Sequence, residues 1–162
     1  MSDLEVLQFI SLKMFYAVVC GAVVGLERRM NGAPAGFKTQ ILVCVGAMLF
    51  CVSPIIAGTL MASETPRVIG QIVTGVGFLG AGSIIHNKTS SVSGLTTAAW
   101  IWFTAAIGIM TGLGHGLVAL FITVTLTIVI SVFRWIEKKY FGDIPKRRYE
   151  TEETKIEVRK AG

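Results

Sequence analysis

The sequence predicts an all-α, polytopic membrane protein: a bundle of five transmembrane helices followed by a short basic cytoplasmic tail. Hydrophobic residues make up 52% of the 162-residue chain and charged residues only 15%, whereas about a quarter of the residues in soluble domains are charged. Five apolar runs are long enough to cross a hydrocarbon core. Nine of the 15 basic residues lie in the last 29 positions, as expected for a segment that stays outside the lipid.

The first apolar run covers roughly residues 7–26, and its acidic N-terminal flank predicts a retained anchor and not a cleaved signal. Gly21 and Gly25 are four residues apart, a spacing that lets two helices approach closely in lipid. A second apolar run covers roughly residues 37–60. The sequence therefore predicts two long helices, with Gly21 and Gly25 at a packing face of the first.

A charged cluster follows the first run directly. Glu27 has Arg28 and Arg29 beside it, and Lys38 and Thr39 follow a short loop that contains proline and glycine. One interpretation is an interfacial charge cluster that anchors the end of the helix. The other is a buried carboxylate that pairs with a cation at the mouth of a cavity. Both interpretations make these residues functional candidates.

The stretch 67–112 is predicted to be the packing centre, because its two apolar runs are rich in small residues. Small residues on one helix face let neighbouring helices pack closely in lipid. In the first of these runs, the residues expected to pack are Gly70, Thr74, Gly77, Gly80, Ala81 and Gly82. The GxGxxG spacing at 75–80 does not indicate a dinucleotide site, because it lies inside an apolar run and not at a strand-to-helix turn.

A polar hairpin at 86–93 leads into the fourth run, which covers residues 94–112, and a fifth run covers roughly 117–135. Thr96 and Thr97 open the fourth run, where their hydroxyls can cap free amides or line a polar pocket.

The charges of the connections predict the orientation. The basic connections alternate with acidic ones, so the positive-inside rule places the N-terminus outside and the C-terminus in the cytoplasm. Residues 1–140 are expected to form the membrane domain and 141–162 the tail. Within the tail, residues 154–160 alternate in a strand-like pattern and resemble the stump of a further domain.

No spacing in the sequence is typical of an enzyme, because Ser/His/Asp, Cys/His and metal-ligand patterns are not found. Cys20, Cys44 and Cys51 lie inside apolar runs and are expected to behave as small buried hydrophobes. We therefore expect no catalytic activity, no cofactor, no bound metal and no nucleic-acid partner. The expected partners are the lipid bilayer, a membrane protein and a second copy of the chain.

Four motifs occur in the order GLERR, AGFKT, GFLGAG and GLTTAA, at 25–29, 35–39, 77–82 and 94–99. Together they closely resemble the MgtC/SapB family of bacterial inner-membrane proteins. The resemblance implies a four- or five-helix membrane domain, often followed by a soluble ACT-like domain. In this chain Glu27 matches the motif acid, Lys38 stands where arginine is common, Thr96 stands where some members have asparagine, and Ser93 stands where a basic residue is frequent.

The resemblance also implies a function in adaptation to low magnesium, stress and survival in host cells, through restraint of a membrane complex such as ATP synthase. A regulatory membrane protein is therefore the first expectation. The alternative is a transporter of Mg²⁺ or protons, which would need polar groups at membrane depth. The polar residues available for such a path are Gln40, Gln71, Thr74, Thr104 and Thr111. They offer few of the carboxylates that Mg²⁺ prefers.

Overall fold

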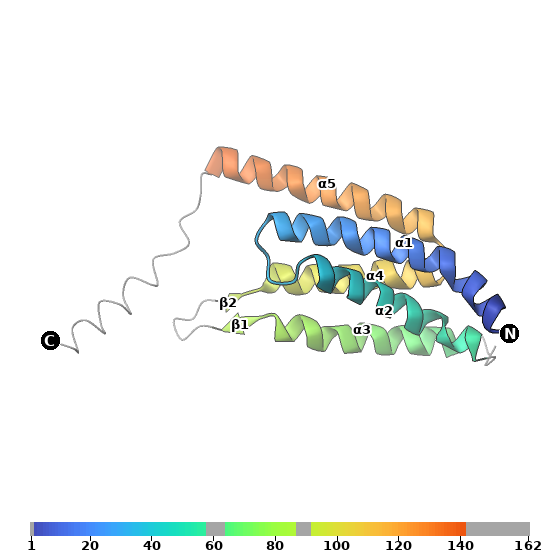
Figure 1. Cartoon of the computed structure of the whole chain (residues 1–162). Helices are drawn as coiled ribbons and strands as arrows, with labels where there is room; N and C mark the ends of the chain where they lie inside the picture. Colours follow the sequence, from blue (N-terminus) through green and yellow to red (C-terminus); the bar gives the residue numbers. More distant parts are fainter. Residues whose placement is uncertain (1, 58–63, 87–91, 142–162) are drawn as a thin grey trace.

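The computed structural model describes residues 2–57, 64–86 and 92–141. The helices in that part of the chain are α1 (Asp3–Met30), α2 (Phe37–Ile56), α3 (Glu64–Gly82), α4 (Leu95–Gly112) and α5 (Gly116–Phe141). Two short strands, β1 (Ile85–His86) and β2 (Val92–Ser93), pair antiparallel between α3 and α4. The predicted all-α class is confirmed, and Figure 1 shows the helices running side by side along one axis.

Among the described residues, α1, α2, α4 and α5 are long and apolar enough to cross a membrane. The helix α3 has 19 residues, but by the same criteria it is not apolar enough, because Glu64, Arg67 and several glycines lower its hydropathy. The predicted class of polytopic membrane protein is confirmed. The predicted number of spanning helices, five, is one more than the four described helices that are long and apolar enough to cross a membrane. The predicted tail strand at 154–160 lies outside the described residues.

The packing centre is α4 and not the α3–α4 pair. α4 lies against all four other helices and buries Trp100, Thr104 and Ile107, among others. In contrast, α3 lies against α2 and α4 and buries only Ile72 and Gly80. The prediction for stretch 67–112 is therefore wrong for its first half, because a glycine-rich helix has little side-chain surface to bury.

Glycines mark the places where helix backbones approach each other. A Cβ atom at Gly108 would lie 2.2 Å from the carbonyl oxygen of Cys44, where α4 crosses α2. A Cβ atom at Gly21 would lie 2.8 Å from the Cα of Ile41, in the contact of α1 with α2. Only a residue without a side chain fits at such crossings.

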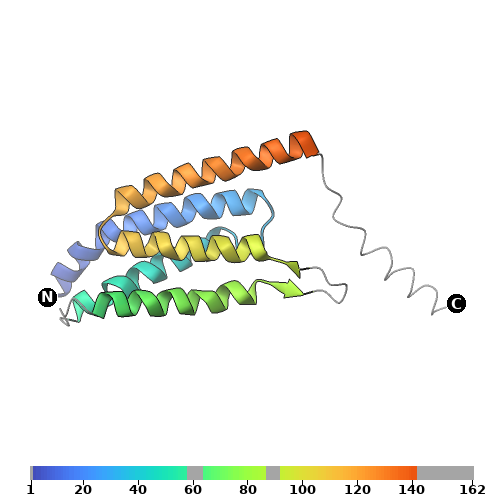
Figure 2. The ribbon, with the colours of Figure 1, turned by 180° about the vertical axis from the view of Figure 1, so that it is seen from behind.

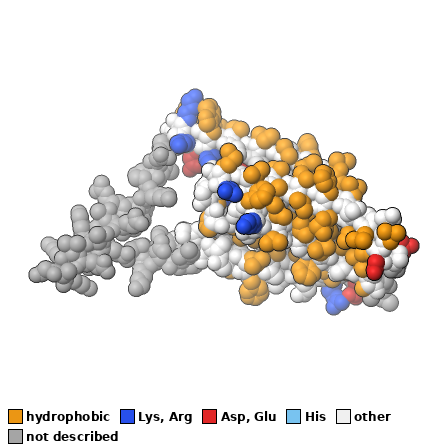
Figure 3. Space-filling view, viewed as in Figure 1, with side chains coloured by type: hydrophobic (Ala, Val, Ile, Leu, Met, Phe, Trp, Pro, Cys, Tyr) orange, Lys and Arg blue, Asp and Glu red, His pale blue; other side chains and the backbone are white. Residues whose placement is uncertain are grey.

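Large hydrophobic side chains are exposed along the bundle, with Phe78, Leu42 and Phe121 each more than 70% exposed. Figure 3 shows hydrophobic side chains spread over the visible face, while most of the visible basic side chains gather at the end where α1 finishes. Apolar patches of this extent are rare on soluble monomers and mark surfaces that contact lipid or other proteins. The exposed surface therefore agrees with a chain that crosses the membrane several times.

Candidate functional site

The candidate site lies where α1 and α5 finish at the same end of the bundle. The helices α1 and α5 run in the same direction and finish at the same end of the bundle, where α5 extends beyond α1 (Figure 1). The two helices are in direct contact. This arrangement brings Glu27 of α1 beside Arg134 of α5.

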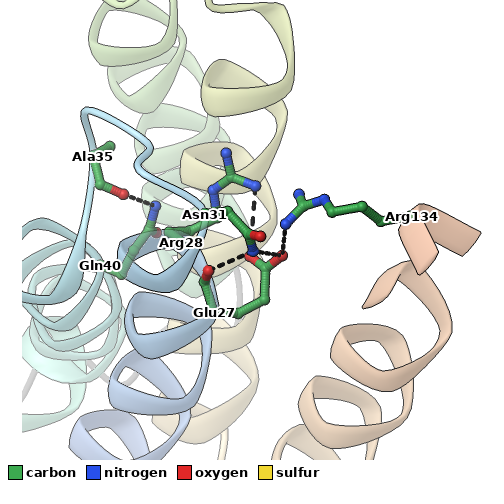
Figure 4. Close-up of polar contacts among 6 residues, drawn as sticks. All are labelled: Glu27, Arg28, Asn31, Ala35, Gln40 and Arg134. Atoms are coloured by element: carbon green, nitrogen blue, oxygen red, sulfur yellow. Dashed lines mark hydrogen bonds and ion pairs between the residues drawn. The ribbon is translucent and has the colours of Figure 1, made fainter. Parts of the chain in front are cut away.

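The carboxylate of Glu27 is the centre of the site, and the residue is only 7% exposed. Its Oε1 atom lies 3.0 Å from Nη1 of Arg134, and its Oε2 atom lies 3.5 Å from Nη1 of Arg28. Asn31 donates a third contact from Nδ2 to Oε1, at 2.7 Å. Figure 4 shows these groups converging on the carboxylate. A buried charge with this set of partners is satisfied by the protein itself.

The sequence around Asn31 explains why the carboxylate is held in place. Asn31 is the C-terminal cap of α1, and its Nδ2 atom also donates to the backbone oxygen of Glu27 at 2.6 Å. The backbone N–H of Asn31 donates to the same carbonyl at 3.2 Å. One residue therefore caps the helix end and orients the carboxylate. Gly32 follows with φ of +65°, a conformation that glycine adopts without strain. The turn leads into the loop before α2.

Arg28 links the site to the central helix. The residue is 5% exposed, and its guanidinium carbon lies 5.8 Å from the ring centre of Trp100 on α4. A guanidinium over an indole ring is attracted by the negative face of the ring. The ion pair with Glu27 and the ring of Trp100 together offset part of the cost of removing Arg28 from water, while its Nε atom is buried without a hydrogen-bond partner.

Gln40 fixes the loop against α2. Its side chain is fully buried, and Nε2 donates to the backbone oxygen of Ala35 at 3.2 Å. Gly25 lets the helices meet here, because a Cβ atom at that position would lie 2.6 Å from the Cα of Phe37. The close contact of α1 and α2 thus positions the end of α1, and with it Glu27.

The predicted functional candidates divide into a buried and an exposed group. Glu27 and Arg28 are buried together, and Thr97 is buried on α4. The exposed candidates are Arg29, Lys38, Thr39 and Thr96. In the described part of the chain, the ion pairs of Glu27 are with Arg28 and Arg134, and not with Arg29 or Lys38. The geometry matches the interpretation of a buried, paired carboxylate.

The predicted packing residues also divide. Gly21 and Gly25 lie against α2. A Cβ atom added at Gly80 would lie 3.6 Å from the Cβ of Ala98 on α4. For Gly70, Gly77 and Gly82, by contrast, an added Cβ atom has no neighbour within 4 Å. Thr74 and Ala81 are exposed. The small residues of α3 thus form an open face among the described residues.

Sequence reasoning missed Arg134 and Asn31. Arg134 could have been found from the order of the helices. The first and fifth apolar runs cross in the same direction, so a cation near the end of the fifth run lies close to the end of the first. The signal for Asn31 was its position four residues after Glu27, which is one helical turn. Neither signal shows by itself which face of each helix turns toward the other.

Two hollows accompany the site. A pocket of about 490 Å³ between α1 and α5 is lined by Glu27, Asn31 and Arg134, among others. A groove of about 590 Å³ between α2 and α3 is lined mainly by apolar residues, with Thr39 and Gln71 as polar members. Among the described residues, no group of three His, Cys, Asp or Glu side chains could hold a metal ion.

Comparison with known proteins places these features in a family. A model of the MgtC family matches residues 14–139. YhiD of Escherichia coli K12, whose name presents it as a candidate magnesium transporter, is 37% identical over 132 residues, which cover 78% of this chain and 60% of YhiD. SapB of Bacillus subtilis 168 is 34% identical over 140 residues, which cover 83% of this chain and 60% of SapB.

MgtC of Salmonella typhimurium LT2 is 40% identical over 104 residues, which cover 64% of this chain and 43% of MgtC. The chain spans about three fifths of the length of YhiD and SapB. No solved structure matches the chain. The family match covers α2, α3 and α4 completely and most of α1 and α5. The chain therefore belongs to the MgtC family, as its four motifs predicted.

Proposed function

We propose that the chain is a non-enzymatic regulatory protein of the bacterial inner membrane that acts by binding another membrane protein. By resemblance, this activity serves adaptation to low magnesium and stress, and a complex such as ATP synthase is the kind of partner expected. The observation that carries the proposal is the open face of α3 formed by Gly70, Thr74, Gly77 and Ala81.

This face suits a partner helix. An added Cβ atom at Gly70 or Gly77 has no neighbour within 4 Å, so another backbone can approach closely there. Small residues promote such contacts in lipid, where helix association depends on van der Waals packing. On another side of α3, a groove of about 590 Å³ that Gly75 and Leu79 help to line offers space for larger side chains, such as leucine or phenylalanine.

The pairing of Glu27 supports regulation over transport. A transport path needs ionisable or polar groups that face a cavity at membrane depth. Glu27 is instead engaged by two arginines. The hydroxyls of Thr111 and Thr123 donate to carbonyl oxygens of their own helices, each at 2.7 Å. The name of YhiD supports the alternative of a cation transporter, but the geometry around Glu27 does not favour Mg²⁺.

The double substitution Gly70→Leu and Gly77→Leu tests the proposal. The new side chains would fill the open face and prevent close approach, so we expect recovery of the partner to fall about tenfold, equivalent to ~1.4 kcal/mol of binding energy. Recovery is measured by purification from native membranes and mass spectrometry. Thr125→Leu, at an exposed position of α5, is the matched control and should leave recovery unchanged. Unchanged recovery with the double variant, or Glu27-dependent magnesium uptake by proteoliposomes, would contradict the proposal.

We propose further that the end of the bundle with the candidate site faces the cytoplasm. The described cations at this end are Arg28, Arg29, Lys38, Arg134, Lys138 and Lys139, whereas Asp3, Glu5 and Glu64 lie toward the other end. Basic residues are retained on the cytoplasmic side during insertion. A fluorescent reporter fused after Gly162 should therefore be active in the cytoplasm. Activity of a periplasm-dependent reporter at the same position would reverse the orientation.

A further inference from the structure

The pocket between α1 and α5 has features that partner binding does not explain. It has a volume of about 490 Å³ and lies at the basic end of the bundle. Figure 1 and Figure 2 both place α5 and α3 on opposite flanks, so this pocket is separate from the open face of α3. An inference about the pocket therefore goes beyond the proposed partner binding and does not depend on it; only the choice of leaflet rests on the proposed orientation.

The charges around the pocket favour an anion. The carboxylate of Glu27 lines it together with Arg134 and Lys138, and Arg28 pairs with the same carboxylate. Three cations thus surround one acid, which leaves an excess of two positive charges. A divalent cation would meet a carboxylate that already has two arginines and an asparagine amide as partners. Mg²⁺ would need several free oxygen ligands instead.

Donors remain for an additional ligand. The ion pair of Arg134 with Glu27 uses Nη1, and about a third of the Arg134 side chain is exposed. Lys138 follows one helical turn later on α5 and makes no ion pair within the described residues. A guanidinium and an ammonium group on adjacent turns can both donate to the oxygens of a phosphate.

The remaining walls of the pocket are mainly apolar. Val23 and Leu26 of α1 and Trp135 of α5 form most of them, and Thr127 and Ser131 of α5 add two hydroxyl groups. On the side of α5, a second hollow of about 310 Å³ continues along the helix, lined by Ile128, Val132 and Trp135, among others. This hollow runs back toward the middle of the bundle, away from the charged end. A mainly apolar hollow on the surface of α5, below a cationic rim, fits a molecule with a phosphate and a hydrocarbon chain.

The position in the membrane agrees with such a molecule. Tryptophan is enriched at the membrane interface, and Trp135 lies level with the charged rim, with Nζ of Lys139 at 4.9 Å from its ring centre. The cytoplasmic leaflet carries the anionic lipids, and basic pockets between helices on that side bind their headgroups. Free phosphate would leave the apolar walls of the pocket unused.

We propose that this pocket binds one anionic phospholipid, with its phosphate at Arg134 and Lys138 and an acyl chain along Ile128 and Val132. The bound lipid would lie between α1 and α5 and neutralise part of the excess charge beside Glu27. Binding would thereby stabilise the contact between the two helices.

The test uses the full chain, purified in detergent and mixed with phosphatidylglycerol, phosphatidylcholine or inorganic phosphate. Native mass spectrometry counts retained lipid, and thermal unfolding reports stabilisation. We expect retention and a higher unfolding midpoint with phosphatidylglycerol alone. Lys138→Gln should weaken this binding about fivefold, the effect of ~1 kcal/mol for one cation near anionic lipid. Because Lys138 is exposed, the variant should fold normally.

Lys38→Gln is the matched control, since Lys38 is an exposed lysine at the same end of the bundle but outside the pocket. It should leave retention unchanged. An equal loss with both variants would indicate general surface attraction and overturn the proposal. Equal retention of phosphatidylcholine would do the same, and so would stabilisation by inorganic phosphate that matches phosphatidylglycerol.

Discussion

Gly108→Ala is expected to lower the free energy of unfolding by ~3 kcal/mol, the upper end of the range for overpacked cores. The added Cβ atom would lie 2.2 Å from the carbonyl oxygen of Cys44 and 2.9 Å from the Cβ of Ala47. The first of these atoms belongs to the backbone of α2, so no side-chain rotation can relieve the overlap. The two helices would have to move apart at the centre of the bundle. Circular dichroism during thermal unfolding in detergent measures the loss.

Gly75→Ala is the matched control. Its Cβ atom has no neighbour within 4 Å, and alanine favours a helix over glycine by up to ~1 kcal/mol. The unfolding midpoint of this variant should be unchanged or higher. Equal midpoints for Gly108→Ala and Gly75→Ala would show that α4 does not pack against α2 as closely as the structure indicates.

This pair of glycines shows which part of the fold the sequence could predict. The length of each apolar run follows directly from the thickness of the bilayer, so the helices and the membrane class could be read from composition. Spacing identifies a face of small residues but not the neighbour that it meets. The glycines at 108 and 112 have the same four-residue spacing as Gly21 and Gly25, and all four pack closely. The small residues of α3 looked similar in sequence, yet its positions 70, 77 and 82 are open.

The candidate site was predicted in the same partial way. The motif placed Glu27 and Arg28 at the end of a helix, and the structure buries both. The partner Arg134 depends on how α1 and α5 are rotated about their axes, and a single sequence contains little information on that angle. Lys38, which is nearer in sequence, is exposed. Proximity along the chain therefore identified the partner Arg28 but not Arg134.

Glu27→Gln is expected to lower the free energy of unfolding by ~3 kcal/mol, because removing one partner leaves the other buried charge uncompensated. Arg28 would lose its counterion while remaining 5% exposed. Arg134 is less affected, since its side chain is 36% exposed and can turn toward water. Chemical or thermal unfolding of the purified variant measures the change. Glu64→Gln, which breaks the exposed pair with Arg67, is the control and should cost under ~1 kcal/mol.

A second substitution separates loss of charge balance from loss of packing. The double variant Glu27→Gln, Arg28→Gln removes both buried charges, so it should recover part of the stability that Glu27→Gln alone loses. If burial of an unpaired arginine is not the cause, the double variant should be no more stable than Glu27→Gln. The comparison also bears on function, because a carboxylate whose main effect is to hold α1, α4 and α5 together is a poor carrier for an ion. Recovery of stability by the double variant, together with no magnesium uptake by the unsubstituted protein, would then favour a regulatory protein over a transporter.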